Sequence, residues 1–214
     1  ETDREDRKSA SYKAFVRKQV FMNPYIWLIS FANFFVYILR FAVLDWGPTL
    51  LKEMKGFSLQ HASWMVAGFE VAGLCGMLLA GWATDRVFKG RGARMCVFCM
   101  VGACVAMGLF WQANSPSFAT NAALLGLAGF FIYGPQALIG IIAANLATNR
   151  ASATAAGFTG LFGYASTLVS GWGLGLLVHD RGWDTAFAAL LGVGAIGALL
   201  FIFAWPAKAH GYGQ

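Results

Sequence analysis

The sequence predicts an all-α membrane protein with six transmembrane helices, and three observations support this prediction. The chain of 214 residues is 58% hydrophobic and only 12% charged, whereas soluble domains average about 25% charged residues. Its apolar residues gather in long blocks separated by short polar connections, which is the pattern of a chain that crosses a bilayer repeatedly. The 26 glycines and eight tryptophans suit close packing between membrane helices and anchoring at the lipid headgroups.

Six apolar blocks, each about 20 residues long or longer, can span the hydrocarbon core as helices. They cover residues 24–51, 59–84, 93–113, 118–147, 153–178 and 183–205. Glycine or proline marks most of the connections between them, as expected where a helix must stop. We therefore expect a polar segment at 1–23, a six-helix transmembrane domain at 24–205 and a tail at 206–214, with the lipid bilayer as the surrounding partner.

Positive charge in the connections sets the orientation, because Lys and Arg are retained on the cytoplasmic side. One set of segments, 1–23, 85–94, 148–152 and 206–214, holds twelve of the 16 Lys and Arg residues, while the opposite set holds three. Both termini of this segment are therefore expected in the cytoplasm. The chain opens on polar residues, without a signal peptide or an initiator Met, so we expect an excerpt that begins in a loop. Six spans with both ends on one side would fit half of a twelve-helix fold.

Composition and motif content argue against three other classes of protein. The net charge of +6 lies in the connections and not along a basic helix, so we expect no nucleic-acid partner. All four cysteines fall inside apolar blocks, and the single C-x-x-C pair lacks the second pair of ligands that a zinc site needs. The sequence shows no nucleophile–base pair and no metal-ligand cluster, so it predicts neither an enzyme nor a bound cofactor.

Arg40 is the most informative residue, because it lies well inside the first apolar block. A charge at the centre of a bilayer costs from about 2.5 to over 10 kcal/mol, so this side chain must face other helices or a water-filled cavity. A guanidinium group matches phosphate through two parallel hydrogen bonds and always keeps its charge. An anion site is therefore one interpretation, and the alternative is an ion pair with Glu70 or Asp45.

The neighbours of Arg40 indicate a polar cavity beside the first span. Helical spacing places Asn33, Tyr37 and Leu44 on the same face as Arg40. Two of these three neighbours can form hydrogen bonds. Further along the block, Pro48 is expected to bend or end the helix near the external side.

Polar groups in the second and fourth blocks extend this cavity. Glu70, in the middle of the second block, could be the counter-ion of Arg40, a gate or a proton carrier. In the fourth block a Gly-Pro pair loosens the helix, which is tolerated next to cavities in membrane proteins. Tyr133 and Gln136 flank that pair, as either substrate contacts or packing residues.

The fifth block combines a possible cavity residue with a stripe of small residues. Tyr164 could face the cavity. The stripe, which predicts close packing against another helix, consists of Gly163, Thr167, Gly171 and Gly175.

The connection GWATDRVFKGRGAR, residues 81–94, resembles the cytoplasmic signature of the major facilitator superfamily. In that superfamily a D-R pair followed by glycine and basic residues links the second and third helices of each half. The matching residues here are Asp85, Arg86, Gly90, Arg91 and Arg94. The resemblance implies the C-terminal half of a twelve-helix major facilitator fold.

Three longer strings narrow the resemblance. FVYILRFAVLDWGPTLLKE, IYGPQALIG and TAAGFTGLFGY are similar to the organophosphate:phosphate antiporters, most of all to the glycerol-3-phosphate transporters among them. The similarity implies a bacterial inner-membrane protein that exchanges an organophosphate, such as glycerol-3-phosphate, a sugar phosphate or phosphoglycerate, for inorganic phosphate by alternating access. It also implies a partner, the N-terminal six-helix half of the same protein, which would supply a second arginine, a histidine and a lysine.

The resemblance assigns roles to individual residues. One arginine from each half holds the substrate phosphate in that family, and the C-terminal one matches Arg40. Tyrosines that line the central cavity match Tyr37, Tyr133 and Tyr164. Acidic residues tied to salt-bridge rearrangement during transport match Asp45 and Glu70.

Two other functions on the same fold stay open, as does the substrate. One is a membrane sensor of sugar phosphate, and the other is a proton-coupled symporter with Glu70 as the carrier. The stretch ASTLVSGWG after Tyr164, and the sequence Ala143-Ala144-Asn145, differ from the glycerol-3-phosphate transporters. The particular organophosphate is therefore not fixed by these residues.

Overall fold

The computed structural model describes residues 10–207, and every regular element in that range is helical. The helices are α2 (Ala10–Val16), α3 (Pro24–Lys55), α4 (Leu59–Arg86), α5 (Gly92–Gln112), α6 (Phe118–Ala147), α7 (Ser152–Leu168) and α8 (Leu174–Phe203), with π-helical turns η1 (Arg17–Phe21) and η2 (Val169–Gly173). Residues 1–9 of the predicted N-terminal segment and 208–214 of the predicted tail lie outside the described range.

Six passes across a membrane follow from these helices. Five continuous stretches are long and apolar enough to cross, and the last of them, Ser152–Phe203, has 52 residues. About 20 residues suffice for one crossing. Gly182 breaks this stretch with φ 79° and ψ 173°, so the chain turns there and crosses twice. The predicted fold class is confirmed, and each predicted span lies within a few residues of a helix in the structure.

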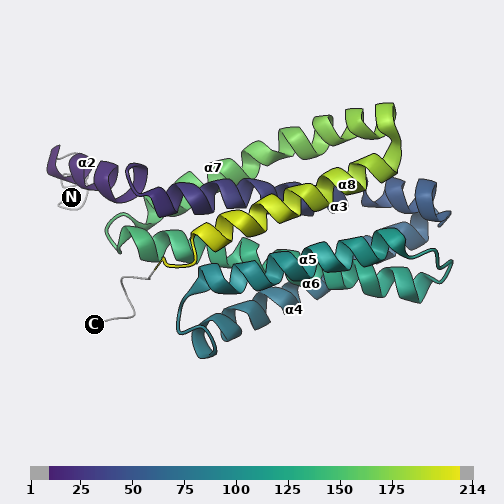
Figure 1. Cartoon of the computed structure of the whole chain (residues 1–214), viewed down its shortest axis with the longest axis horizontal. Helices are drawn as coiled ribbons and strands as arrows, with labels where there is room; N and C mark the ends of the chain where they lie inside the picture. Colours follow the sequence, from purple (N-terminus) through teal and green to yellow (C-terminus); the bar gives the residue numbers. More distant parts are fainter. Residues whose placement is uncertain (1–9, 208–214) are drawn as a thin grey trace.

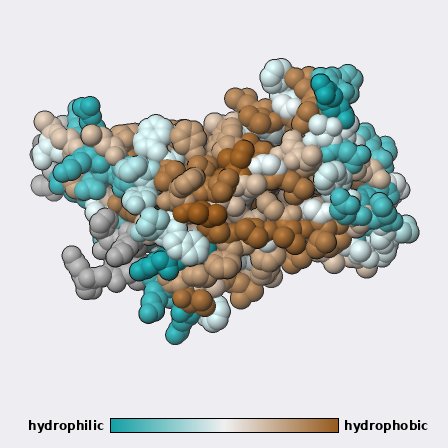
Figure 2. All heavy atoms as spheres, viewed as in Figure 1, coloured by the Kyte–Doolittle hydropathy of each residue, from teal (hydrophilic) through white to brown (hydrophobic). Residues whose placement is uncertain are grey.

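The helices lie side by side along the long axis of the molecule (Figure 1). A broad hydrophobic band covers the middle of the visible face, with hydrophilic residues towards both ends (Figure 2). The α4–α5 and α6–α7 connections lie at the same end as α2, whereas the α3–α4 and α5–α6 connections lie at the other (Figure 1). The basic connections that predicted the orientation therefore share one end of the bundle.

Local sequence signals start and stop the long helices. The side chain of Asn23 accepts a hydrogen bond of 3.0 Å from the first turn of α3, and Pro24 is the first helical residue. Ser58 and Ser117 cap α4 and α6 in the same way. Gly56 ends α3 in the left-handed conformation, with φ 70°, which only glycine adopts without strain.

Pro48 does not end α3, although the sequence allowed that outcome. The helix continues through it to Lys55. Leu50 and Leu51 are buried among the neighbouring helices, and this packing offsets the backbone hydrogen bond that proline cannot form.

Helix α2 docks on the α6–α7 connection. The hydroxyl of Tyr12 donates to the carbonyl oxygen of Arg150 at 3.3 Å. The guanidinium of Arg150 lies over the rings of Tyr12 and Phe15, 5.5 and 5.6 Å from their centroids. The described part of the segment before the first span is therefore attached to the bundle through cation–π contacts.

The opposite end of the bundle is joined by side-chain hydrogen bonds between helices α3, α5 and α8. Two indole N–H groups donate to carboxylates, each at 2.8 Å, and one lysine caps the end of α5. These bonds are Trp183–Glu53, Trp111–Asp184 and Lys55 to the carbonyl oxygen of Phe110.

Helices α4 and α6 pack backbone against backbone in the middle of the bundle. A Cβ added at Gly76 would lie 1.8 Å from the carbonyl oxygen of Phe130, and one at Gly129 would lie 2.3 Å from that of Phe69. No side chain fits at either position. This seam fixes the relative height and rotation of the two helices, each of which carries a predicted site residue.

Replacing Gly76 with alanine should destabilise the folded protein. The new methyl group meets backbone that cannot give way, which typically costs about 1–3 kcal/mol. The matched control is Gly68→Ala in the same helix, where nothing lies within 4 Å of the added Cβ. Thermal unfolding of the full-length protein in detergent should show a lower Tm for Gly76→Ala only. Equal Tm values for the two variants would contradict the close seam.

Candidate substrate-binding site

Three of the predicted site residues meet at mid-depth in the bundle, each from a different helix. Arg40 lies halfway along α3, Tyr133 halfway along α6 and Glu70 near the middle of α4. The α4–α6 seam places Glu70 and Tyr133 beside each other. The face of α3 that carries Arg40 then turns towards both.

Tyr133 bridges the two charged groups. Its hydroxyl accepts a hydrogen bond of 3.0 Å from Nε of Arg40 and donates one to Oε1 of Glu70. Nη2 of Arg40 is 4.0 Å from the same carboxylate oxygen. The guanidinium also lies over the Tyr133 ring, 4.9 Å from its centroid. The two opposite charges are thus linked through a phenol and do not form a close bidentate pair.

This arrangement lowers the cost of charge at mid-depth and still leaves the cation accessible. A buried ion pair costs less than a lone buried ion, because each charge compensates the other. The Arg40 side chain keeps 21% of its surface exposed and that of Glu70 keeps 38%. The outer edge of the guanidinium, which carries the N–H groups suited to a phosphate, is not occupied by the bond to Tyr133.

Three more predicted residues, from α3, α7 and α6, lie close to one another. The rings of Tyr37 and Tyr164 meet edge to face, with centroids 6.3 Å apart. Tyr164 is 70% exposed, so its hydroxyl is free to face a ligand. Gln136 lies beside Tyr37, and its side-chain oxygen is buried without a hydrogen-bond partner in the described range.

Asn33 and Asp45 lie apart from this cluster. Asn33 is only 4% exposed and donates to the carbonyl oxygen of Thr159 at 2.9 Å, so in this structure it ties α3 to α7 and does not reach the exposed site surface. Asp45 is exposed and takes part in no ion pair within residues 10–207. Of the two partners considered for Arg40, the structure pairs it with Glu70.

The predicted stripe of small residues, which runs from α7 through η2 to the start of α8, packs only partly as expected. Its two ends approach α3 closely: a Cβ at Gly163 would lie 2.9 Å from Nδ2 of Asn33, and one at Gly175 would lie 2.8 Å from the Trp46 ring. Gly171 in between has nothing within 4 Å. Residues four apart advance about 400° around an α-helix, so such a stripe drifts by about 40° at each step, and Gly171 lies outside the close contact with α3.

The signature residues form a tight turn at the end of the bundle, away from Arg40. Asp85 and Arg86 are the last residues of α4, and both are exposed. Gly90 has φ 76° and donates its N–H to the carbonyl oxygen of Thr84 at 2.9 Å. At the start of α5, the guanidinium of Arg94 lies 5.1 Å from the centroid of Trp205, which follows the last span.

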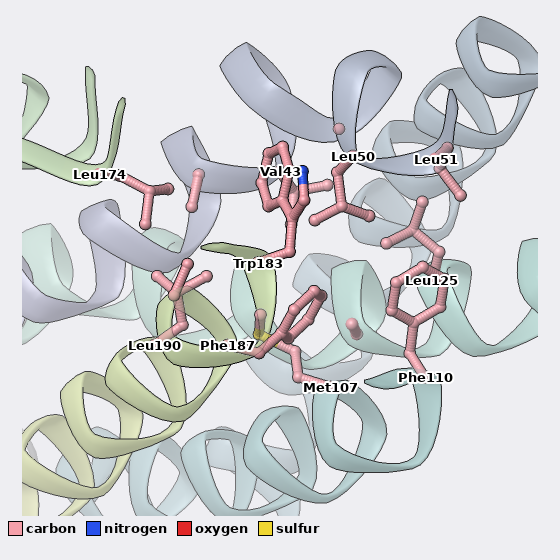
Figure 3. A pocket seen from close by; sticks show the side chains of 14 residues that line it. Val43, Leu50, Leu51, Met107, Phe110, Leu125, Leu174, Trp183, Phe187 and Leu190 are labelled. Atoms are coloured by element: carbon pink, nitrogen blue, oxygen red, sulfur yellow. The ribbon is translucent and has the colours of Figure 1, made fainter. Parts of the chain in front are cut away.

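An enclosed cavity between α3, α5, α6 and α8 is not the candidate site. Its lining is apolar, and Figure 3 shows Leu50, Trp183 and Phe187 among the side chains that surround it. The space amounts to about 20 Å³, which is room for roughly one water molecule. An anion without polar partners would be strongly disfavoured there, so we interpret it as a packing void.

Sequence reasoning missed two features near the site. It did not anticipate that the Tyr133 hydroxyl would stand between Arg40 and Glu70, because distances between helices cannot be read from periodicity. It also missed the turn η2 and the hydrogen bond of 3.0 Å from Nε1 of Trp46 to the carbonyl oxygen of Ser170. The glycine-rich run SGWGLG was the one available signal for an irregular helix.

The fold and the site define a multi-pass helical membrane protein with a charged cluster at mid-depth. A comparison with family models matches the Major Facilitator Superfamily over residues 29–213. The chain belongs to this superfamily and, within it, to the organophosphate:phosphate antiporter family. The relatives that match are named as transporters or as a membrane sensor, and not as enzymes.

Three relatives illustrate the match. A probable hexose phosphate transport protein of Chlamydia muridarum is 38% identical over 96% of this chain and 45% of its own length. A glycerol-3-phosphate transporter of Bacillus subtilis is 38% identical over 92% and 45%. The membrane sensor protein UhpC of Salmonella typhimurium is 37% identical over 90% and 43%. The chain thus spans less than half the length of these relatives.

If the cluster binds inorganic phosphate, removing the Tyr133 hydroxyl should weaken that binding without unfolding the protein. Tyr133→Phe keeps the ring that packs against Phe69 but removes the hydroxyl that holds Nε of Arg40, which lets Arg40 form a closer pair with Glu70 that competes with the anion. A hydrogen bond to a charged group is worth about 1.5–3 kcal/mol, so the Kd for inorganic phosphate should rise roughly 10- to 100-fold, as measured by calorimetry on the full-length protein.

The control for this variant is Tyr25→Phe, which removes a hydroxyl near the start of α3, far from the cluster. It should leave both the Kd and the Tm unchanged. An unchanged Kd for Tyr133→Phe would show that the bridge has no part in binding phosphate.

Proposed function

We propose that this chain forms the C-terminal half of a transporter that exchanges an organophosphate for inorganic phosphate by alternating access. The observation that carries the proposal is Arg40, a permanent cation at mid-depth whose side chain is 21% exposed and is held by Tyr133 and Glu70. A charge in this position is costly to maintain, and a phosphate ligand is the chemistry that makes use of it. The names of the relatives, which refer to hexose phosphate and glycerol-3-phosphate, support the same substrate class.

In the proposed mechanism the phosphate group binds at the midplane, between this half and the N-terminal six-helix half. Arg40 supplies charge and a forked pair of donors. Tyr37, Tyr164 and Gln136 line the surface that the rest of the substrate would meet, and the two halves rock around the loaded site. Either phosphate species lowers the barrier to rocking only through its differential affinity for the states involved.

Glu70 has a specific place in this mechanism as the counter-ion of the empty site. With no substrate, it offsets the charge of Arg40 through Tyr133. An incoming phosphate brings its own negative charge and competes with Glu70 for the guanidinium. The separation of 4.0 Å between the charged atoms makes this exchange less costly than breaking a close pair would be. Asp45 and Asn33 are proposed to act only in other conformations, with Asp45 as a salt-bridge partner.

The same proposal includes the setting of the chain. The protein would reside in a bacterial inner membrane, and the six-helix domain at 24–205 would span it. Segment 1–23, the signature turn at Asp85–Arg94 and the tail 206–214 would lie on the cytoplasmic side. The bias of Lys and Arg towards one set of connections and their location at one end of the bundle (Figure 1) support this orientation.

A second candidate is a membrane sensor of sugar phosphate. The chain is 37% identical to the membrane sensor protein UhpC over 90% of its length. This similarity supports a sensor almost as strongly as the similarity to transporters supports the antiporter. A sensor would bind the same ligands through Arg40 but carry little flux.

Uptake into proteoliposomes separates these functions. The full-length protein would be reconstituted in vesicles loaded with inorganic phosphate and offered labelled glycerol-3-phosphate, 3-phosphoglycerate or glucose-6-phosphate. Antiport predicts uptake that requires internal phosphate and identifies the substrate. Binding without uptake would indicate the sensor, and uptake driven by a pH gradient without internal phosphate would indicate proton coupling.

Arg40→Lys should nearly abolish uptake by correctly inserted protein. Lysine keeps the charge but loses the planar fork that matches phosphate. With at least one charged hydrogen bond lost, the rate at low substrate should fall by about 10- to 100-fold. The matched control is Arg181→Lys, next to the break at Gly182 between the last two spans and away from Arg40. This variant should transport normally. Near-normal uptake by Arg40→Lys would contradict the role of Arg40 as the phosphate ligand.

A further inference from the structure

The turn η2 lets two glycines on either side of it, Gly163 in α7 and Gly175 at the start of α8, both face α3. Gly163 and Gly175 both lie against α3, yet they are twelve positions apart. Twelve residues of α-helix rotate through about 1,200°, which would leave these two positions about 120° apart around the axis. A π-helical turn has more residues per turn, because its hydrogen bonds span five residues. Inserting η2 between the glycines therefore removes much of the offset.

Trp46 of α3 holds this turn directly. Its indole N–H donates to the carbonyl oxygen of Ser170, within η2, at 3.0 Å. A Cβ added at Gly175 would lie only 2.8 Å from the Trp46 ring. The absence of a side chain at Gly175 therefore makes room for the ring. Ser170 itself is fully buried. The hydrogen bond and the missing side chain together fix the ring of Trp46 against the irregular turn.

The contacts of α3 with α7 bracket the two cavity tyrosines. Asn33 is bonded to Thr159 on one side, and Trp46 is bonded to Ser170 on the other. The Tyr37–Tyr164 contact, with ring centroids 6.3 Å apart, lies between them along both helices. Any relaxation of η2 towards a regular α-helix must therefore rotate part of α7 relative to α3 between these two ties.

We propose that Trp46 is a positioning residue for Tyr164: by holding η2, it sets the rotation of α7 that points the Tyr164 side chain into the cavity beside Tyr37. Trp46 itself contacts no substrate in this proposal. The consequence for substrate selection rests on the proposed function, because it requires Tyr164 to meet the organic part of the substrate. The orientation of residue 164 is a structural claim that is independent of the proposed function.

Thiol labelling tests the structural part without any need for transport. Tyr164→Cys would be introduced into the full-length protein with the other accessible cysteines, including Cys75, replaced by serine. A charged methanethiosulfonate reagent then reports the accessibility of position 164. Residue 164 is already 70% exposed, so rotation should reduce its exposure. Loss of one hydrogen bond shifts a conformational equilibrium roughly two- to tenfold, and Trp46→Phe should slow labelling by about this factor.

Two matched pairs of variants make this test specific. Trp111→Phe also removes an indole donor, the one to Asp184, and should not change the labelling rate. Gly175→Ala should slow labelling as Trp46→Phe does, because its methyl group displaces the indole, whereas Gly171→Ala meets nothing within 4 Å and should not. An unchanged rate in both Trp46→Phe and Gly175→Ala, or an equal loss in the controls, would overturn the proposal.

Exchange kinetics test the functional part. In proteoliposomes, Trp46→Phe should raise the KM for the organophosphate by roughly two- to tenfold and leave the KM for inorganic phosphate nearly unchanged, because the latter is proposed to bind Arg40. In a Tyr164→Phe background the same substitution should have no further effect. An equal further effect there would show that Trp46 acts independently of Tyr164. Absence of any exchange by the wild-type protein would count against the proposed function, while the labelling result would stand by itself.

Discussion

The charge of Arg40 in the middle of the bundle is the constraint on which the rest of the structure depends. An isolated cation at this depth is too costly to persist, so the fold must bring a counter-charge and hydrogen-bond acceptors to it. Tyr133 and Glu70 provide both, the former at 3.0 Å. They can do so because α4 and α6 approach each other without intervening side chains at Gly76 and Gly129. The glycine seam is thus as much a part of the site as the residues that face the ligand.

The same arrangement explains how a buried cation can remain available. A close bidentate pair with Glu70 would compete strongly with any ligand, whereas the observed link through a phenol offsets the charge and leaves 21% of the Arg40 side chain exposed. The proposed exchange of phosphate species requires this balance, because a site that bound one anion too tightly would not release it.

The sequence predicts the fold to within a few residues at each helix, because hydrophobic blocks and their capping residues act locally. It also identifies Arg40, Glu70 and Tyr133, since polar groups inside apolar blocks stand out. It says less where the outcome depends on how helices pack. In this structure the amide of Asn33 bonds to α7, Gly171 lies outside the close contact with α3, and α3 continues through Pro48 to Lys55. Each of these outcomes depends on tertiary packing and not on the local pattern.

The most direct test of the role of Arg40 is a structure of the full-length protein determined with and without inorganic phosphate. If the site works as proposed, the phosphate lies within hydrogen-bonding distance of the Arg40 guanidinium, with its forked N–H groups on the anion and Glu70 moved away from them. A phosphate bound elsewhere, with Arg40 still linked to Glu70 through Tyr133, would show that the cluster is a structural ion pair and not the substrate site.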